Sequence, residues 1–296
     1  MTAPTFALVG VGFVAGRHID AIHEVGGKLV AASDPHDGVG VLDRYGTGVQ
    51  FQRTDYIPRG KFDYIVIAAP NDSHAALIGG ALHRNSDVIC EKPLVLHAWH
   101  VDALMERERE SVRRVWPILQ MRLNPALLAW RERDKVVHWL GEEKGWTRHR
   151  FRVSLDYVAP RGPWYWASWK GDEARSGGLA TNIGVHLFDV LLWLFGGVQH
   201  SEVTYRDRPS NPRAMAGRLV LDRADVTWSL STLGQKPSRI MRIDDEEIDL
   251  SEGFTSLHTA VYREILAGRW YGLADARPAI ALCERLRTLA PSGAPR

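Results

Sequence analysis

Two patterns of hydrophobic and polar positions divide the chain near residue 120. Up to about residue 118, short apolar runs rich in β-branched residues alternate with amphipathic stretches. Strands are predicted in the segments TFALVG, KLVAASD, FDYIVIAAP, DVICEKPL and VRRVWPILQMR. Helices are predicted over AGRHIDAIHEVG, SHAALIGGALHRN and residues 97–111. Mostly apolar strands separated by helices indicate a parallel sheet that is covered on both faces.

Beyond residue 120 the period of the pattern shortens to two. After a helix predicted near residues 124–140, apolar and polar positions alternate in WTRHRFRVSLDYV, HSEVTYRDR, AMAGRLVLD, DVTWSLSTL and SRIMRIDDEEIDL. This alternation is typical of an antiparallel sheet with one covered face. A helix that carries Asn182 and His186 interrupts these strands, and two more helices are expected near residues 255–268 and 274–289.

The expected fold class is therefore α/β followed by α+β. Residues 1–120 are predicted to form an N-terminal Rossmann dinucleotide-binding domain. Residues 121–296 are predicted to form a C-terminal α+β domain, built on a largely antiparallel open sheet, for substrate binding and oligomerisation. The length of 296 residues fits this division, because it exceeds that of one typical domain.

Composition and charge limit the classes of binding partner and the cellular compartment that we expect for the protein. A formal net charge of +2, with no Lys/Arg-rich block interleaved with aromatic residues, argues against a nucleic-acid partner. Cys90 and Cys283 have no CxxC partner, which fits a reducing cytoplasm. The apolar run Leu187–Val198 contains Asp189 and is too short to span a bilayer, while Phe6–Val9 is interpreted as a strand rather than a signal peptide. We expect a cytoplasmic protein with no membrane partner.

Residues 10–15, GVGFVA, fit the pattern G-x-G-x-x-G/A between a predicted strand and a predicted helix. The first glycine permits a tight turn, and the second lets the backbone approach a pyrophosphate at the helix N-terminus. Asp34, after the next strand, would accept hydrogen bonds from ribose hydroxyls and repel a 2′-phosphate, so NAD is expected rather than NADP. The alternative is a glycine turn that only joins a strand to a helix. The expected cofactor contacts here are Gly10, Gly12, Phe13, Val14 and Asp34.

A lysine is predicted at the carboxyl end of a parallel strand, in the segment Cys90-Glu91-Lys92-Pro93. Doubly wound sheets bind ligands at that edge, and the proline biases Lys92 toward an extended backbone. A lysine held beside a nicotinamide could stabilise an alkoxide that develops on a substrate hydroxyl. The alternative is a surface lysine at a turn.

Asn182 and His186 are four residues apart, so on one helix they would share a face, with Asp189 three residues further along the same side. Apolar residues follow at 191–194. Two interpretations stay open for this polar stripe. Its members are either satisfied polar groups in a core or the floor of an active site.

Residues 161–178 bring cations and aromatic residues together in one segment, with Arg161, Lys170 and Arg175 among Trp164, Tyr165, Trp166 and Trp169. The cations could neutralise a diphosphate or a uronate, and the aromatic rings could stack on a base or a pyranose. The alternative is packing between subunits. Gln120 and Arg122, at the predicted domain junction, could also reach a substrate. His97 and His100 lack an accompanying carboxylate or thiolate cluster, so no metal site is expected.

The order of these motifs resembles the Gfo/Idh/MocA oxidoreductases. The elements that carry the resemblance are GVGFVA, AAPNDSH, EKP and a GG-x₃-[DN]-x-G-x-H helix, and they span nearly the whole chain. Within that family, the chain looks most like the UDP-N-acetylglucosaminuronate (UDP-GlcNAcA) 3-dehydrogenases of bacterial surface-polysaccharide synthesis. The segments that favour this branch are RGPWYWASWKGD, ATNIGVHLFD and SEGFTSLHTAVYREILAGRWYG.

The resemblance implies roles for particular residues. Lys92 matches the EKP lysine and His186 the catalytic histidine, while Asn182 stands where most relatives carry aspartate, which leaves His186 as the proton acceptor. Further cofactor contacts are expected at Pro70, Asn71, His74, Glu91 and Lys92. Substrate contacts are expected at Gln120, Arg122, Arg161, Trp164, Lys170, Asn182 and His186.

The implied reaction is NAD-dependent oxidation of the C3 hydroxyl of UDP-GlcNAcA to the 3-keto sugar. Two alternatives stay open: a dehydrogenase of another sugar, inositol or nucleotide sugar, and a protein that senses NAD(H) without turnover. The presence of both Lys92 and His186 argues against the sensor, which has no chemical need for them. We also expect a homo-oligomer, a dimer or tetramer that associates through the C-terminal sheet.

Overall fold

The computed structural model of the chain describes residues 2–36, 40–44, 48–143, 149–251 and 257–292. The chain divides into two compact units. Unit 1 combines Met1–Gln120 with Thr255–Ile280, and unit 2 combines Met121–Phe254 with Ala281–Arg296. The change of pattern at residue 120 coincides with a boundary between the units. Residues 255–280, which a single boundary at 120 assigns to the C-terminal domain, belong to unit 1.

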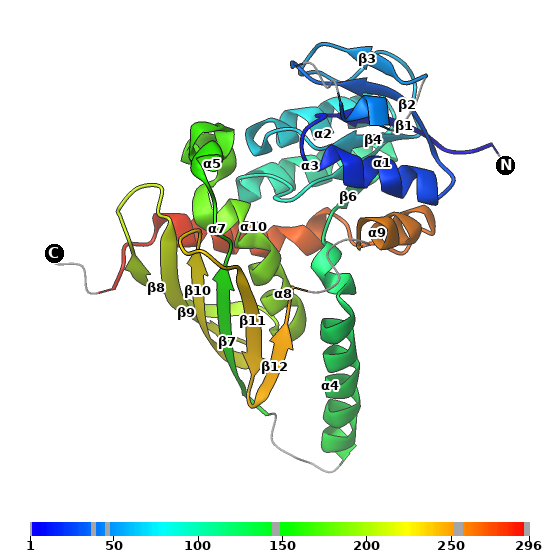
Figure 1. The fold of residues 1–296 in the computed structure, drawn as a ribbon. Helices are drawn as coiled ribbons and strands as arrows, with labels where there is room; N and C mark the ends of the chain where they lie inside the picture. Colours follow the sequence, from blue (N-terminus) through cyan, green and yellow to red (C-terminus); the bar gives the residue numbers. More distant parts are fainter. Residues whose placement is uncertain (1, 37–39, 45–47, 144–148, 252–256, 293–296) are drawn as a thin grey trace. The chain divides into compact units, whose positions relative to one another are not determined.

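Unit 1 contains the predicted parallel sheet, with strands in the order β3-β2-β1-β4-β5-β6 (Figure 1). All of its strand pairs are parallel. The strands are β1 (Thr5–Val9), β2 (Lys28–Ser33), β3 (Gln50–Gln52), β4 (Tyr64–Ile67), β5 (Asp87–Cys90) and β6 (Val115–Pro117). The structure adds β3, which sequence analysis missed because its three residues are not buried and show no apolar pattern.

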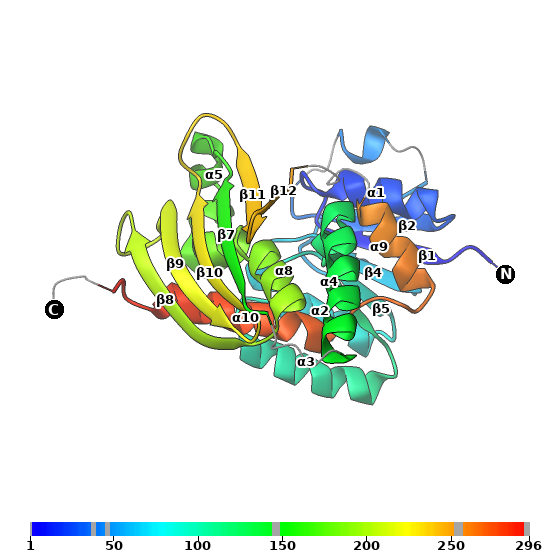
Figure 2. The same cartoon turned by 90° about the horizontal axis from the view of Figure 1, so that it is seen from below.

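Four helices cover the two faces of this sheet. They are α1 (Ala15–Glu24), α2 (His74–His83), α3 (Ala98–Ser111) and α9 (Leu257–Leu266). Helices α1 and α9 pack together on one face, and α2 and α3 pack together on the other (Figure 2). Residues 65–67 and 88–90 in the middle of the sheet are therefore buried without alternation, as in other doubly covered parallel sheets.

Unit 2 contains a second six-stranded sheet, in the order β12-β11-β7-β10-β9-β8. The pair β7–β10 is parallel and the other pairs are antiparallel. The strands are β7 (Phe151–Val158), β8 (Val198–Arg206), β9 (Ala214–Leu221), β10 (Ala224–Ser231), β11 (Ser238–Ile243) and β12 (Glu246–Asp249). The segment SRIMRIDDEEIDL, predicted as one strand, is a hairpin, because the left-handed backbone of Asp244 (φ 51°) turns the chain between β11 and β12.

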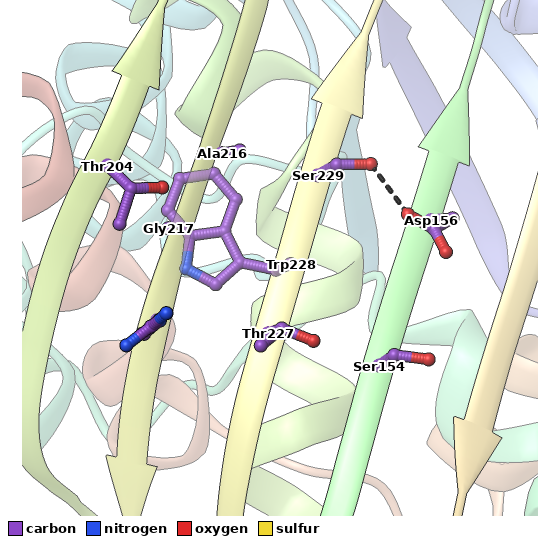
Figure 3. Close-up of a pocket in the computed structure, with 9 residues that line it drawn as sticks. Ser154, Asp156, Thr204, Ala216, Gly217, Thr227, Trp228 and Ser229 are labelled. Atoms are coloured by element: carbon purple, nitrogen blue, oxygen red, sulfur yellow. Dashed lines mark hydrogen bonds between the residues drawn. The ribbon is translucent and has the colours of Figure 1, made fainter.

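Helices α7 (Gly178–Asn182) and α8 (Val185–Phe195) pack on one face of the second sheet. Unit 2 also contains α4 (Pro125–Glu143), α5 (Pro163–Ala167) and α6 (Glu173–Ser176), and the residues of α10 (Leu273–Thr288) fall in both units. Phe188 of α8 packs edge-on against Trp228 of β10, with ring centroids 5.3 Å apart. The opposite face carries short polar side chains, and a hollow of about 300 Å³ opens beside Asp156, Ser229 and Gly217 (Figure 3).

Within the described ranges, no single helix is long and apolar enough to cross a membrane. The two segments Glu173–Asn182 and Val185–Phe195, which are bent relative to each other, are long and apolar enough for a membrane span when taken together, by length and composition only. Most residues of α8 are buried inside the protein.

Candidate active site

The glycine turn lies where the order of the first sheet reverses, between β1 and β4. Gly10 has a left-handed backbone (φ +91°), and a Cβ atom there would lie 2.5 Å from the carbonyl oxygen of Ala68, just after β4. Its amide donates to the carbonyl oxygen of Ser33 at the end of β2, at 2.8 Å. Only glycine fits this close approach. The turn therefore joins three strand ends at the point where open α/β sheets bind ligands.

The turn also leaves room for a dinucleotide. A Cβ atom at Gly12 would meet nothing within 4 Å, and Phe13 is 89% exposed. Helix α1 begins at Ala15, as predicted, and its N-cap residue Val14 makes no side-chain capping bond. One carboxylate oxygen of Asp34 accepts from the amide of Val11 at 2.7 Å, which holds the acid against the turn. These residues fit NAD: open backbone at a helix N-terminus for the pyrophosphate and a carboxylate for the ribose.

The loop after β4 is fixed by His74, the first residue of α2. The ring of His74 is fully buried, and its two nitrogens lie 2.9 Å from the carbonyl oxygens of Ala69 and Pro93. Burial lowers the pKa of His74, against the opposing effect of these two backbone contacts. A neutral imidazole donates through one nitrogen only, so His74 donates to one of these carbonyl oxygens and lies against the other. The ring thus lies between the loop at Pro70 and Asn71 and the loop that follows Lys92. Its predicted cofactor contact stays a prediction.

Lys92 lies two residues beyond the end of β5, at the predicted edge of the sheet. The Lys92–Pro93 peptide bond is cis, and the lysine is partly buried. Its backbone amide donates to Oε2 of Glu91 at 3.1 Å. The Glu91 side chain is itself buried beside His18 and His258, in a cluster that sequence analysis did not find.

Sequence analysis predicted that Asn182 and His186 lie on one continuous helix. In the structure they lie on two successive helices. Asn182 ends α7 and His186 is the second residue of α8, and the axis bends by 44° between the two segments. The bend falls at Gly184, where a Cβ atom would lie 2.5 Å from the carbonyl oxygen of Ala180 and 2.7 Å from Leu230 of β10. Close packing at this point leaves room only for glycine. The i, i+4 spacing alone does not place both side chains on one face.

Asn182 has a partner that sequence analysis had grouped with the stacking residues. Its amide nitrogen donates to the hydroxyl oxygen of Tyr165 at 2.6 Å, and both residues are buried. Burial raises the pKa of Tyr165, against the opposing effects of this hydrogen bond and the charge of Arg161. The phenol therefore stays protonated near neutral pH, and Tyr165 anchors α5 to α7 in unit 2.

The cations predicted to bind substrate lie over aromatic rings. Nζ of Lys170 is 5.3 Å from the ring centroid of Trp164 and 5.6 Å from that of Trp169, distances typical of cation–π contacts. The guanidinium of Arg161 is 5.6 Å from the ring of Tyr165. Burial, and to a smaller extent the charge of Arg161, lowers the pKa of Lys170. This arrangement suits an anion, because it holds two cations near each other beside exposed aromatic surface.

The two residues predicted at the domain junction differ in their surroundings. Gln120 is 3% exposed, and its side-chain oxygen has no hydrogen-bond donor among the described residues. A buried acceptor of this kind needs a donor from elsewhere. Arg122 instead forms a buried bidentate ion pair with Asp189 of α8, at 3.0 and 2.7 Å. Arg122 and Asp189 are therefore paired with each other in the core of unit 2.

Comparison with known proteins agrees with this geometry. The Gfo/Idh/MocA oxidoreductase model for the NAD-binding Rossmann fold matches residues 5–118, and the model for the C-terminal alpha/beta domain of the same oxidoreductase family matches residues 149–232. A solved structure of the WlbA (WbpB) dehydrogenase from Thermus thermophilus, in complex with NAD and UDP-GlcNAcA, is 42% identical, with a TM-score of 0.87. The alignment covers 98% of this chain and 96% of that one.

Relatives by sequence are more distant. A D-apiose dehydrogenase from Rhizobium rhizogenes is 25% identical over 94% of this chain and 80% of its own length. An inositol 2-dehydrogenase from Rubrobacter xylanophilus is 33% identical, but the match covers 39% of this chain and about a third (34%) of that protein. Taken with the two matching domains and the Thermus thermophilus structure, these results show that the chain belongs to the Gfo/Idh/MocA family and is an NAD-binding oxidoreductase.

Proposed function

We propose that the protein oxidises the C3 hydroxyl of UDP-GlcNAcA to the 3-keto sugar, as a step in the synthesis of a surface-polysaccharide sugar. The observation that carries this proposal is the 42% identity, over 98% of the chain, to a dehydrogenase crystallised with NAD and UDP-GlcNAcA. Two features of this chain support a charged sugar substrate. The Arg161–Lys170 pair beside the tryptophans suits an anionic group, and the buried acceptor oxygen of Gln120 suits a group that donates, such as a sugar hydroxyl.

In this proposal the residues have separate tasks. His186 accepts the proton of the C3 hydroxyl, and Lys92 stabilises the negative charge that develops on the oxygen. Asn182, held by Tyr165, cannot act as an acid or base and orients the sugar. NAD, when bound over the glycine turn, supplies the hydride acceptor. Arg161, Trp164 and Lys170 bind the charged and aromatic parts of the nucleotide sugar.

The test is a comparison of substrates with the purified protein and NAD. Formation of NADH is measured with UDP-GlcNAcA, UDP-GlcNAc, UDP-glucuronate and myo-inositol. We expect the largest kcat/KM for UDP-GlcNAcA, because only this substrate presents both the uronate and the N-acetyl group. A larger kcat/KM for myo-inositol would contradict the proposal and favour the activity named for several sequence relatives.

The same assay tests the fate of the reduced cofactor. The Thermus thermophilus dehydrogenase has also been crystallised with NAD and α-ketoglutarate. We infer that a 2-oxo acid reoxidises NADH on this protein, which would allow repeated turnover with catalytic amounts of NAD. Adding α-ketoglutarate should then increase the yield of 3-keto sugar beyond one equivalent per bound cofactor. A yield that stays at one equivalent would show that NADH must leave in each cycle.

A further inference from the structure

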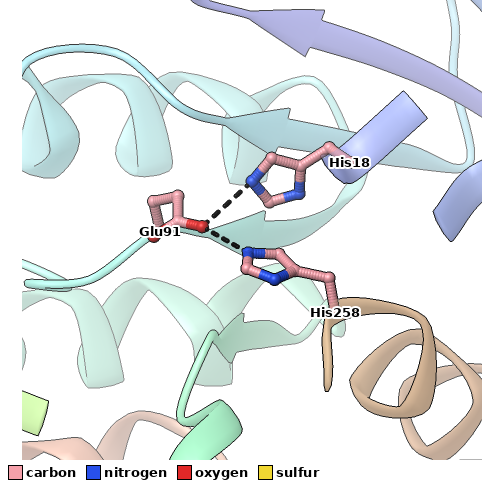
Figure 4. A group of neighbouring side chains, drawn as sticks. All are labelled: His18, Glu91 and His258. Carbon is pink, nitrogen blue, oxygen red and sulfur yellow. Dashed lines mark hydrogen bonds and ion pairs between the residues drawn. The ribbon is translucent and has the colours of Figure 1, made fainter. Parts of the chain in front are cut away.

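Three buried side chains meet in unit 1: His18 of α1, His258 of α9, and Glu91, which directly follows β5 and precedes Lys92 (Figure 4). Oε1 of Glu91 lies 2.8 Å from Nε2 of His258, on α9, and 3.2 Å from Nε2 of His18, on α1. The two imidazole rings stand edge to face, with centroids 5.2 Å apart. Beyond them, Nδ1 of His18 lies 2.9 Å from the hydroxyl of Tyr262. We call these four residues the Glu91 cluster.

The protons of the cluster follow from its contacts. Burial by itself raises the pKa of Glu91, but its contacts with His18 and His258 hold it well below its ordinary value, so Glu91 is a carboxylate. A carboxylate only accepts, so His258 donates through Nε2–H at 2.8 Å. Nε2 of His18 lies 3.2 Å from the same oxygen, outside hydrogen-bond geometry. His18, whose pKa is lowered mainly by burial, is neutral and accepts the Tyr262 proton at Nδ1. Burial also raises the pKa of Tyr262 well above its ordinary value, so it keeps that proton.

The same three side chains could hold a metal ion, because one ligand atom from each lies within 4.8 Å of the others. The contacts favour a hydrogen-bonded arrangement. Nε2 of His258 already donates to Oε1 of Glu91 at 2.8 Å, whereas a cation there would need an unprotonated nitrogen from each histidine. The cluster is therefore a buried carboxylate held between two histidine rings, and Glu91 also contacts the backbone of Lys92.

Glu91 connects the cluster to Lys92. Its Oε2 accepts from the backbone amide of Lys92 at 3.1 Å, and its own amide donates to the carbonyl oxygen of Ile67 on β4 at 2.9 Å. The hydrogen bond to its amide fixes the backbone of Lys92 relative to Glu91. Contacts from α1, β4 and α9 thus converge on Glu91, next to Lys92.

We propose that His18 and His258 are positioning residues for Lys92, acting through Glu91. The inference rests on the proposed role of Lys92 in stabilising the oxyanion. Residues 255–280 belong to unit 1, and through His258 and Tyr262 their helix α9 forms half of the anchor. The expected effect is one of geometry, because displacing a catalytic group by about 1 Å can lower the reaction rate about 10²-fold.

Two variants of His258 separate hydrogen bonding from packing. His258→Phe keeps a ring of similar size but removes the donor to Glu91, whereas His258→Gln can still donate from its amide. We expect His258→Phe to lower kcat about 10- to 100-fold with little change in the Kd of NAD, and His258→Gln to recover most of that loss. His83→Gln, an exposed histidine of the same unit, is the matched control and should behave like the wild type.

A double-mutant cycle of Glu91 and His258 tests whether the effect of His258 on kcat passes through Glu91. Glu91→Ala should lower kcat, and adding His258→Phe to it should lower kcat no further, because the shared link is already lost. Equal kcat for His258→Phe and the wild type, or independent losses in the double variant, would overturn the inference. So would a stoichiometric metal ion, measured by elemental analysis of the purified protein.

The proposed role of Lys92 is tested separately with Lys92→Met. Normal turnover in Lys92→Met refutes that role, and with it the reason for positioning the lysine. Strong loss in Lys92→Met combined with normal turnover in His258→Phe refutes the positioning inference alone. Should His258→Phe fail to fold, as shown by thermal unfolding, Glu91→Ala still decides, because normal turnover in that variant refutes the positioning inference.

Discussion

Asp189→Leu is expected to destabilise unit 2 strongly, because it removes one partner of a buried ion pair. The side chains of Arg122 and Asp189 are 6% and 3% exposed, and two charged hydrogen bonds join them at 3.0 and 2.7 Å. Without the carboxylate, the guanidinium stays buried and uncompensated. Breaking a buried pair in this way costs about 3–5 kcal/mol, and we expect the free energy of unfolding to fall by that amount.

The double variant Arg122→Met/Asp189→Leu should recover most of this loss, because no unpaired charge remains in the core. Urea unfolding followed by circular dichroism gives the free energies of the wild type, both single variants and the double variant. Their double-mutant cycle then gives the coupling energy of the pair. A loss below about 1 kcal/mol for Asp189→Leu, in the range of exposed pairs, would refute the reasoning. So would a double variant as unstable as Asp189→Leu.

The same variant has an expected effect on activity. Asp189 lies on α8 three residues after His186, so the ion pair to Arg122 fixes the helix that carries the proposed base. We expect Asp189→Leu to lower kcat more than it changes the Kd of NAD, because the glycine turn lies in unit 1. A weakened Kd with unchanged kcat would contradict this link.

Further predictions concern the cofactor, the base, the substrate cations and pH. Asp34→Ala should weaken NAD binding in titrations and reduce discrimination against NADP, because the carboxylate beside the turn is lost. His186→Ala should lower single-turnover NADH formation by about 10²- to 10⁴-fold while NAD still binds; near-normal rates would return this histidine to a structural role. Arg161→Ala and Lys170→Ala should raise KM for substrate more than they lower kcat. The pKa of His18 is lowered in the folded state. The free energy of unfolding should therefore keep its full His18 contribution above about pH 6.5 and decrease below it, because the unfolded chain takes up the proton more readily. His18→Gln should flatten this part of a plot of melting temperature against pH.

The order of strands and helices could be predicted from sequence because burial alternates locally along each element. Every strand of unit 1 except β3 lies in a predicted segment, and the glycine turn with Asp34 is set by neighbours in the chain and by the next strand. Parallel strands covered on both faces must be apolar throughout, and a pyrophosphate turn needs glycine whatever surrounds it. These requirements act over a few residues, so sequence alone determined them.

Tertiary structure decided what depends on distant residues. Only glycine fits at position 184 because Leu230 packs against it, and Tyr165 meets Asn182 only once α5 and α7 are folded together. The Glu91–His258 contact joins residues 167 positions apart, and neither histidine of the cluster has a local signal that separates it from any other helical histidine. Such contacts exist only when α1, β5 and α9 pack into one core, because a buried carboxylate finds its donors wherever the fold places them.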